Sequence, residues 1–465
     1  MTGRPETNGR PMLAPRVGRL VLALISTMVL SLPAGSIFAQ EPEQLPAAAP
    51  IETPSITDAR VTTLEVQVRE LRAALSGSKP KSTAVKVPEP TKYPTIKLNG
   101  LLHIDGGWVE QDAANRDQLG DIDNSLGFRR ARIGAEGFLT EQLYYRIVPD
   151  FALGGRPSFR DAFVEYRDLE GVGTIRLGES RQPFGMDAQT PANHQPFLER
   201  SLANALSPFR QVGLGIRNHN EDETVTWHVG AFGFPTDQFG NAVSDSGFGV
   251  VGRLTALPWT SADEKSLIHF GVDYGWEHPG DAGLRYRSTP EYSGLLTGPN
   301  GNMLVVPPFV DTGLLVNATS NLFNVELASI TGPLVLQAEA VCALTELESG
   351  DSATFAGGYV QALFVLTGEV HEYDRDFGSI ERLKPNCPIT EGGIGAWELA
   401  GRLSTLDLND GPVDGGRVHD ATLGVNWFLN GHTRLQFNAI RSFLDRAPEG
   451  KSQATIYAAR LAIDF

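Results

Sequence analysis

Arginines recur at alternating positions in otherwise apolar stretches, and their chemistry suits the handling of anions. Arg130 and Arg132 share one face of the stretch 128–138, while Ile133 and Ala135 share the other. This period of two is that of a β-strand. A guanidinium group stays charged and presents five hydrogen-bond donors in a planar fork, so it can replace part of an anion's hydration shell. The pattern predicts strands whose arginines line a water-filled lumen and whose apolar face meets lipid.

The candidate pore-lining and anion-binding groups are the arginines whose phase or position favours the lumen. Arg129 is out of phase with Arg130, so we expect it near the membrane interface rather than in the lumen. As an alternative, the arginines pair with lumen carboxylates and merely hold the wall together. The carboxylates that could do so are Asp150, Asp161, Glu165 and Glu136. The candidates are Arg130, Arg132, Arg146 and Arg176 on strands, and Arg200 and Arg210 in or beside an inner loop.

The part of the chain from 96 to 465 has the organisation that such arginines need. Segments of about ten residues alternate apolar and polar positions and are separated by Gly, Asp, Asn and Pro clusters. The pairs at 410–411 (Asp-Gly) and 430–431 (Asn-Gly) suit tight turns. The last segment alternates up to a terminal Phe465, which is typical of bacterial outer-membrane barrels. We therefore predict an all-β transmembrane antiparallel barrel.

The alternation stops between Gly185 and Arg210. Residues 197–206 have the apolar pattern of a short helix, and Ser207 and Pro208 would end it. A loop that carries a helix inside a barrel would constrict the pore.

The first 95 residues differ from the rest. Residues 1–39 have the basic start, apolar core and small terminal residue of an export signal peptide. Residues 40–55 are rich in Pro and Ala and are expected to be disordered. Residues 56–76 have two heptads of a coiled-coil helix, which could bring copies together or serve as a periplasmic spacer. Residues 77–95 are a Pro/Lys linker.

Several classes of function are disfavoured. The formal charge of −16 argues against a nucleic-acid partner. Two cysteines, Cys342 and Cys387, do not indicate a metal site, and sequence does not decide whether they pair. The glycine pattern at 247–252 lacks the following helix of a dinucleotide site. The histidines are scattered outside any nucleophile motif, so a barrel lipase or protease is a distant alternative, and no catalytic residue or cofactor is expected.

The chain resembles the phosphate-selective porin O and P family of outer-membrane porins over roughly residues 96–465. The stretches that carry the resemblance are 128–132 (FRRAR), 160–166 (RDAFVEY), 176–179 (RLGE) with 183–185 (PFG), 199–202 (ERSL), 359–361 (YVQ) with 366–369 (LTGE), 395–400 (GAWELA) and 406–410 (LDLND).

This resemblance implies a barrel of about 16 strands, a homotrimer in outer-membrane lipid, and basic residues that conduct small anions such as phosphate. One feature departs from it: after the linker the chain has only Lys97, Lys265, Lys384 and Lys451, so a lysine-rich vestibule is not evident. The prediction is thus a passive outer-membrane porin that prefers anions. The alternative is a general or cation-tolerant porin with structural ion pairs in its lumen.

Overall fold

The computed structural model describes residues 92–152, 157–208, 210–235, 243–298 and 301–465. The predicted signal peptide (1–39), disordered segment (40–55) and coiled-coil helix (56–76) lie outside the described residues, as does most of the linker (77–95). Within the described residues, no helix is long and apolar enough to span a membrane.

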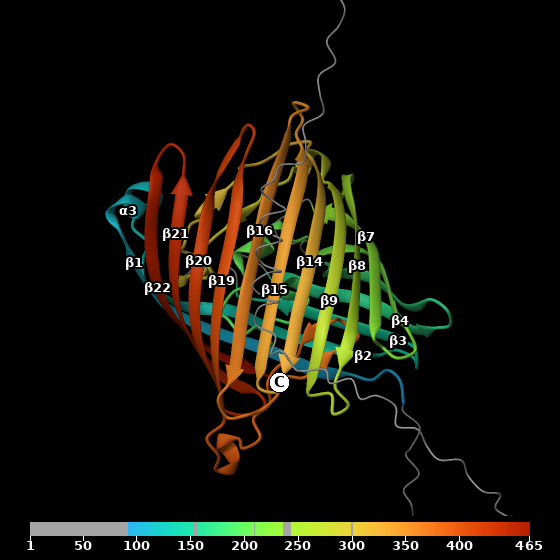
Figure 1. Ribbon diagram of the computed structural model, residues 1–465. Helices are drawn as coiled ribbons and strands as arrows, with labels where there is room; N and C mark the ends of the chain where they lie inside the picture. The colour runs from blue at the N-terminus through green and yellow to red at the C-terminus, as the bar shows by residue number, and fades with distance from the viewer. Residues whose placement is uncertain (1–91, 153–156, 209, 236–242, 299–300) are drawn as a thin grey trace, which may run out of the picture. The chain divides into compact units, whose positions relative to one another are not determined.

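Sixteen strands form one closed antiparallel barrel in which each strand pairs with its neighbours in sequence (Figure 1). The first and last strands pair from Leu101–Asp464 to Gln111–Ala454, which closes the sheet. The predicted barrel is thus confirmed. Its strands are β1 (Lys97–Gln111), β2 (Ser125–Phe138), β3 (Leu143–Asp150), β4 (Ser158–Leu169), β5 (Gly173–Arg181), β6 (Arg210–His219), β7 (Val225–Pro235), β8 (Val243–Thr260), β9 (Ser266–His278), β14 (Thr319–Thr331), β15 (Leu334–Glu346), β16 (Ser352–Val365), β19 (Ala396–Asp410), β20 (Val413–Phe428), β21 (Thr433–Arg446) and β22 (Gly450–Asp464).

The remaining elements are short and lie in the connections. The helical ones are α3 (Ala113–Leu119), α4 (Met186–Gln189), η1 (Leu202–Leu206), η2 (Gly280–Ala282) and η3 (Ile389–Glu391). The extended ones are β10 (Arg287–Ser288), β11 (Leu295–Gly298), β12 (Gly301–Leu304), β13 (Val310–Asp311), β17 (Tyr373–Asp374) and β18 (Ser379–Ile380).

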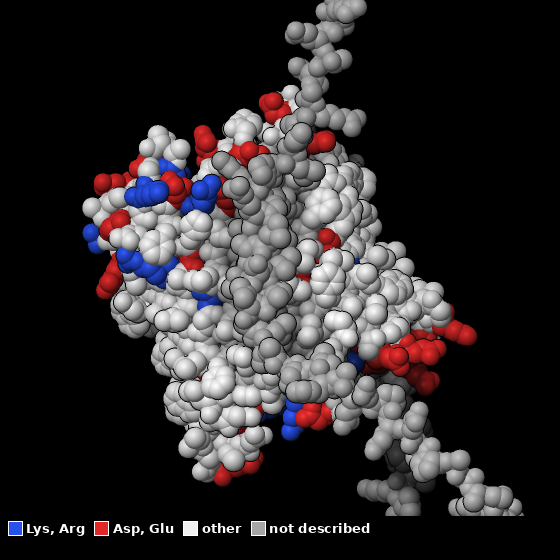
Figure 2. Space-filling view, in the orientation of Figure 1, with Lys and Arg blue, Asp and Glu red and all other residues white. Residues whose placement is uncertain are grey.

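The alternation along each strand separates an apolar outer face from a polar lumen. On β2, Ile133 is 61% exposed and Arg130 is 5% exposed. On β20, Leu423 is 70% exposed and Thr422 is buried. Figure 2 shows few charged groups on the visible wall, and most of them gather toward its two ends. An apolar band between polar ends is what a bilayer requires of a barrel.

Parts of three long connections fold into the lumen. The segment 182–209 follows β5, the segment 279–318 follows β9, and the segment 366–395 follows β16. The first was predicted, and we call it the inner loop. Its predicted helix over 197–206 was wrong in extent, because the structure has only α4 and the 3-10 helix η1 there.

The inner loop is held against one side of the barrel by apolar packing. Phe184, Leu198 and Leu202 are buried in a cluster that includes Tyr359 of β16 and Leu406 of β19. Close approach needs a glycine at 357, because a Cβ there would lie 3.1 Å from the Cα of Ala203 in η1. This packing holds the inner loop against the barrel strands β15, β16, β19 and β20. The other side of the loop faces the arginines of β2, β4, β5 and β6.

Candidate functional site: an arginine-lined chamber

A cavity of about 290 Å³ lies between the inner loop and the lumen side of β2, β4, β5 and β6. We call it the arginine chamber. Neutral polar groups of Gln182, Gln189, Asn204 and Ser293 contribute to its lining. Glu199 is the only acidic residue among the described residues that line it. Its basic lining residues are Arg129, Arg130, Arg132, Arg160, Arg181, Arg200 and Arg210.

Glu199 joins the inner loop to the wall through arginines. Its carboxylate accepts hydrogen bonds from Nε of Arg129 at 2.5 Å and from Nη2 of Arg130 at 3.3 Å. Nη2 of Arg460 lies 3.5 Å from Oε1 of Glu199. Burial alone would raise the pKa of Glu199, but the charges of these arginines hold that pKa well below its usual range. Glu199 therefore stays ionised and serves as a positioning group for the arginines.

The position of Arg129 corrects the expectation that it sits near the membrane interface. In the pairing of β1 with β2, His103 is opposite Arg130 and Ile104 is opposite Phe128, so Arg129 is an extra residue in β2. A bulge of this kind breaks the strict alternation of side chains. Arg129 and Arg130 consequently both reach Glu199 inside the lumen. A sequence periodicity argument that assumes a regular strand misses this residue.

The wall arginines share carboxylates that come from β3 and β4. Nε of Arg132 donates to Oδ2 of Asp150 at 2.8 Å, and Nε of Arg160 donates to the same oxygen at 3.3 Å. Arg210 pairs with Asp161 and donates to the carbonyl of Arg160. Each carboxylate thus fixes the direction of its guanidinium groups and offsets only part of their charge.

Arg181 and Arg200 differ from the others because neither forms an ion pair with a carboxylate among the described residues. Nη1 of Arg181 donates to the carbonyls of Ala188 at 3.0 Å and Thr190 at 2.9 Å. Arg200 donates to the carbonyls of Asp187, Ala188 and Thr190 at 2.9, 3.3 and 2.7 Å. The end of α4 therefore holds two guanidinium groups in place through neutral acceptors, which leaves their charge available to a ligand.

Backbone groups of the inner loop are anchored on the opposite wall. The amides of Met186 and Asp187 donate to Glu339 of β15 at 3.0 and 2.6 Å, and the amide of Gly185 donates to Asp273 of β9 at 3.0 Å. The carboxylate of Asp187 accepts from the amide of Ser201 at 2.9 Å. These bonds fix α4, and through it Arg181 and Arg200.

The chamber brings together four of the six predicted site residues. Arg130, Arg132, Arg200 and Arg210 line it. Sequence reasoning left out Arg160 and Arg181, which lie at the ends of strands beside connections, and it missed Glu199. The signal that could have found Glu199 is its place in the 199–202 stretch, next to Arg200.

The other two predicted residues do not line the chamber. Arg146 pairs with Glu136 at 2.8 Å and with Asp161 at 3.2 Å. Arg176 pairs with Glu165 at 2.6 Å, and its guanidinium carbon lies 4.2 Å from the ring centroid of Phe163. For these two arginines, the contacts agree with the alternative in which ion pairs hold the wall.

The chemistry that the chamber can perform is the electrostatic binding of an anion. Five of the seven lining arginines pair with the carboxylates of Glu199, Asp150 and Asp161, and Arg181 and Arg200 pair with no carboxylate among the described residues, so positive charge is in excess. Among the described residues, no group of three or more His, Cys, Asp or Glu side chains could hold a metal ion. Cys342 and Cys387 are both free.

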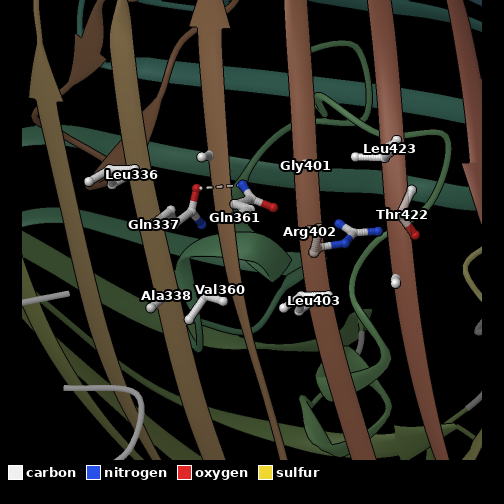
Figure 3. A pocket seen from close by; sticks show the side chains of 12 residues that line it. Leu336, Gln337, Ala338, Val360, Gln361, Gly401, Arg402, Leu403, Thr422 and Leu423 are labelled. Carbon is white, nitrogen blue, oxygen red and sulfur yellow. Dashed lines mark hydrogen bonds between the residues drawn. The ribbon is translucent and has the colours of Figure 1, made fainter. Parts of the chain in front are cut away.

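The wall formed by β15, β16 and β19 carries both neutral polar and charged groups toward the lumen, and Glu339 and Glu398 are among the charged ones. Figure 3 shows Gln337, Gln361 and Arg402 on β15, β16 and β19, each next to an apolar neighbour: Leu336, Val360 and Leu403. Nε2 of Gln361 donates to Oε1 of Gln337 at 3.0 Å, and both side chains are buried. Leu403, which alternates with Arg402, is 62% exposed. Apart from Arg200 of the inner loop, the arginines that line the chamber come from β2, β4, β5 and β6, so they are concentrated on one side of the lumen.

Residues 96–465 match the family described as phosphate-selective porin O and P. An uncharacterized protein of Caulobacter vibrioides is 25% identical over 390 residues, which cover 80% of this chain and 74% of that protein. Among solved structures, an anion-selective porin from Comamonas acidovorans is 13% identical with a TM-score of 0.47, over 79% of this chain and 99% of the other. The outer membrane channel DcaP of Acinetobacter baumannii is 12% identical with a TM-score of 0.49, over 80% and 97% of the two chains.

Proposed function

The chain belongs to the phosphate-selective porin O and P family and is an outer-membrane porin, and we propose that its passive channel prefers small anions, with phosphate-type oxyanions as the leading class. The observation that carries this proposal is the arginine chamber. Seven guanidinium groups line it against one lining carboxylate. An oxyanion accepts hydrogen bonds in the bidentate geometry that arginine offers.

The arrangement also suits passage rather than permanent binding. A pore must replace lost hydration with enough donors to admit an ion, yet no single site can hold that ion too tightly. Arg132 and Arg160 already share Asp150, and Arg129 and Arg130 already share Glu199. Their remaining donors are numerous and individually weakened, so an anion can move from one group to the next.

A second candidate is a general or cation-tolerant porin. The observation that favours it is that Arg146 and Arg176 are engaged by carboxylates outside the chamber. If the chamber arginines were equally neutralised, the lumen would discriminate little between ions. The unpaired charge of Arg181 and Arg200 favours the anion channel instead.

The assembly and orientation are part of the proposal. We expect a homotrimer surrounded by outer-membrane lipid, as the resemblance to the family implies. The short connections such as 332–333 and the strand termini at Lys97 and Asp464 lie at one end of the barrel. Short turns face the periplasm in outer-membrane barrels, so we place the segment before β1 there.

The test is current recording through single channels in planar bilayers under a KCl gradient, followed by added phosphate. An anion-preferring pore gives a reversal potential displaced toward that of chloride, and a phosphate site gives a concentration-dependent block of the chloride current. A reversal potential at the potassium side would exclude the anion proposal. An anion-selective pore without phosphate block would retain the anion channel and remove phosphate as its leading ligand.

A further inference from the structure

Arg441 is a charged residue on the outer, lipid-facing side of the barrel. It lies on β21 between Ile440 and Ser442, which are both fully buried, whereas Phe437 and Phe443 share its face and are 49% and 46% exposed. Because side chains alternate along a strand, Arg441 points away from the lumen. It therefore lies outside the arginine chamber, and its charge has another role.

The described residues give Arg441 no ion-pair partner. Its Nη1 donates to Oγ1 of Thr455 on β22, and its guanidinium carbon lies 5.7 Å from the ring centroid of Phe443. Its other neighbour across the strands is Ala421 on β20. The outward carboxylate in the same row is Glu110 on β1, which is opposite Thr455 and so two strands, or about 10 Å, from Arg441. Most donors of this guanidinium group thus have no partner among the described residues.

Arg441 lies near one edge of the apolar band rather than at its middle. From Thr433, where β21 begins, to Arg441 the strand advances about 27 Å. A tilt of about 35–45° reduces this to about 20 Å across the membrane, and the band of such a barrel is about 25 Å tall. The guanidinium group can therefore reach the headgroup layer at the end that carries α3. Figure 2 shows Lys and Arg side chains gathered at that end of the visible wall.

Two apolar grooves in the outer wall begin beside Arg441. The larger, of about 630 Å³, contains Ala439, which shares the outward face of β21 with Arg441 and precedes it by two residues. The smaller, of about 390 Å³, contains Ala421, which is opposite Arg441 (Figure 3). Leu423 lines both grooves and is 70% exposed, so it separates them. The bulky side chains that flank the small ones are Trp108, Leu403, Phe437 and Tyr457.

We propose that Arg441 and the two grooves form a binding site for a phosphorylated, multiply acylated lipid of the outer leaflet, of the lipid A type. A headgroup phosphate accepts hydrogen bonds from the planar fork of the guanidinium group. Acyl chains lie in the grooves on either side of Leu423. A charge on the lipid face destabilises a barrel, and the phosphate offsets that cost. The site lies outside the lumen, so this inference goes beyond the proposed anion channel and rests only on the orientation proposed for the barrel.

Native mass spectrometry of the purified, detergent-solubilised porin tests the site. The probes are lipid A with both phosphates, fully dephosphorylated lipid A, phosphatidylglycerol and inorganic phosphate. The variants are Arg441→Gln, which removes the charge, and Ala439→Phe, which fills the larger groove. Arg285→Gln is the matched control, because Arg285 is also an exposed arginine but pairs with Asp311. Folding of each variant is checked by heat-modifiable gel mobility.

We expect phosphorylated lipid A to bind the native porin and the control equally. Arg441→Gln should weaken its binding about tenfold, through the loss of one charged contact. Ala439→Phe should weaken the binding of both forms of lipid A. Equal binding of phosphorylated lipid A by the native porin and Arg441→Gln would overturn the site, as would equal binding of the two forms of lipid A by the native porin.

The remaining probes separate the lipid from other occupants. Binding of inorganic phosphate as tight as that of lipid A, with the same dependence on Arg441, would overturn the lipid assignment. Subunits that separate in Ala439→Phe, together with no lipid bound to the native porin, would show that the grooves join copies of this chain instead. A preference for phosphatidylglycerol that depends on Arg441 would overturn both the lipid assignment and the orientation. The reversal potential of the unmodified channel reports separately on anion preference, so a cation-selective channel that binds lipid A through Arg441 would retain the lipid site and exclude the anion proposal.

Discussion

Replacement of Arg181 and Arg200 by glutamine is the sharpest perturbation of the arginine chamber. Both residues line it, and neither forms an ion pair with a carboxylate in the part of the chain that the structure describes. Their removal therefore takes away positive charge without exposing a buried negative partner. The other lining arginines would keep their carboxylates and their directions.

The expected size follows from Coulomb's law. A unit charge in contact with an ion at about 4 Å contributes about 1 kcal/mol in water and about 4 kcal/mol at an effective dielectric constant of 20. The lower figure suits a hydrated lumen, so the two substitutions together weaken anion preference by about 2 kcal/mol, or roughly 30-fold. Salt screens little over this distance, because the Debye length is about 10 Å at 0.1 M.

The assay is the reversal potential of single channels under a KCl gradient. We expect Arg181→Gln with Arg200→Gln to shift it strongly toward the potassium potential. The double lysine variant keeps both charges and loses the fork of hydrogen bonds to Ala188 and Thr190, so it separates charge from loop anchoring. Arg285→Gln is the matched control, because Arg285 pairs with Asp311 outside the chamber. A double glutamine variant with the native reversal potential would refute the reasoning.

Two further predictions concern single side chains in the connections. Burial, followed by the charges of nearby arginines, lowers the pKa of His194 to about 3, whereas an unfolded histidine titrates near about 6.5. As the pH falls from about 7 toward 3, the unfolded chain thus binds a proton at this histidine before the folded chain does, so folding becomes less favourable. We expect the His194→Asn variant to lose less thermal stability than the native protein over that range, measured in heat-modifiability gels. An equal loss in both proteins would contradict the burial of His194. Cys387 is exposed and both cysteines are free, so a water-soluble maleimide should label Cys387, and reductant should leave gel mobility unchanged; a reductant-dependent shift would show that Cys387 and Cys342 pair.

The barrel could be predicted from sequence because its signal is local and repeated. Within about ten residues, each strand indicates which face is apolar and which is polar, as Ile133 and Arg132 do on β2. The pair Asp410–Gly411 indicates a tight turn, and with it the position where one strand ends and the next begins. A bilayer tolerates little deviation from this alternation over the membrane span, so the pattern and the fold correspond closely.

The candidate site could be predicted only in part because it depends on contacts distant in sequence. Arg129 points into the lumen because of a bulge in β2, which the alternating sequence pattern does not indicate. Glu199 gains its role from Arg129 and Arg460, which lie far from it along the chain. The inward path of the connection 366–395 depends on partners such as Arg253, whose contact with Phe377 no local pattern indicates.

The predictions about residues 1–95 remain predictions. They concern the signal peptide, the coiled-coil helix and the linker, of which the structure describes only the last few residues. Truncation before Lys97 would show whether these residues matter for the stability of the proposed trimer, because the barrel is complete without them.

The closure of the barrel has a consequence for biogenesis. Asp105 of β1 pairs with Arg460 of β22 at 2.6 Å across the seam between the first and last strands. The same arginine donates to the carbonyl of Leu198 at 2.6 Å and lies 3.5 Å from Glu199. The inner loop thus contacts a side chain whose own ion-pair partner lies across the seam. We expect a barrel whose seam has not closed to lack the Asp105–Arg460 pair that orients this contact.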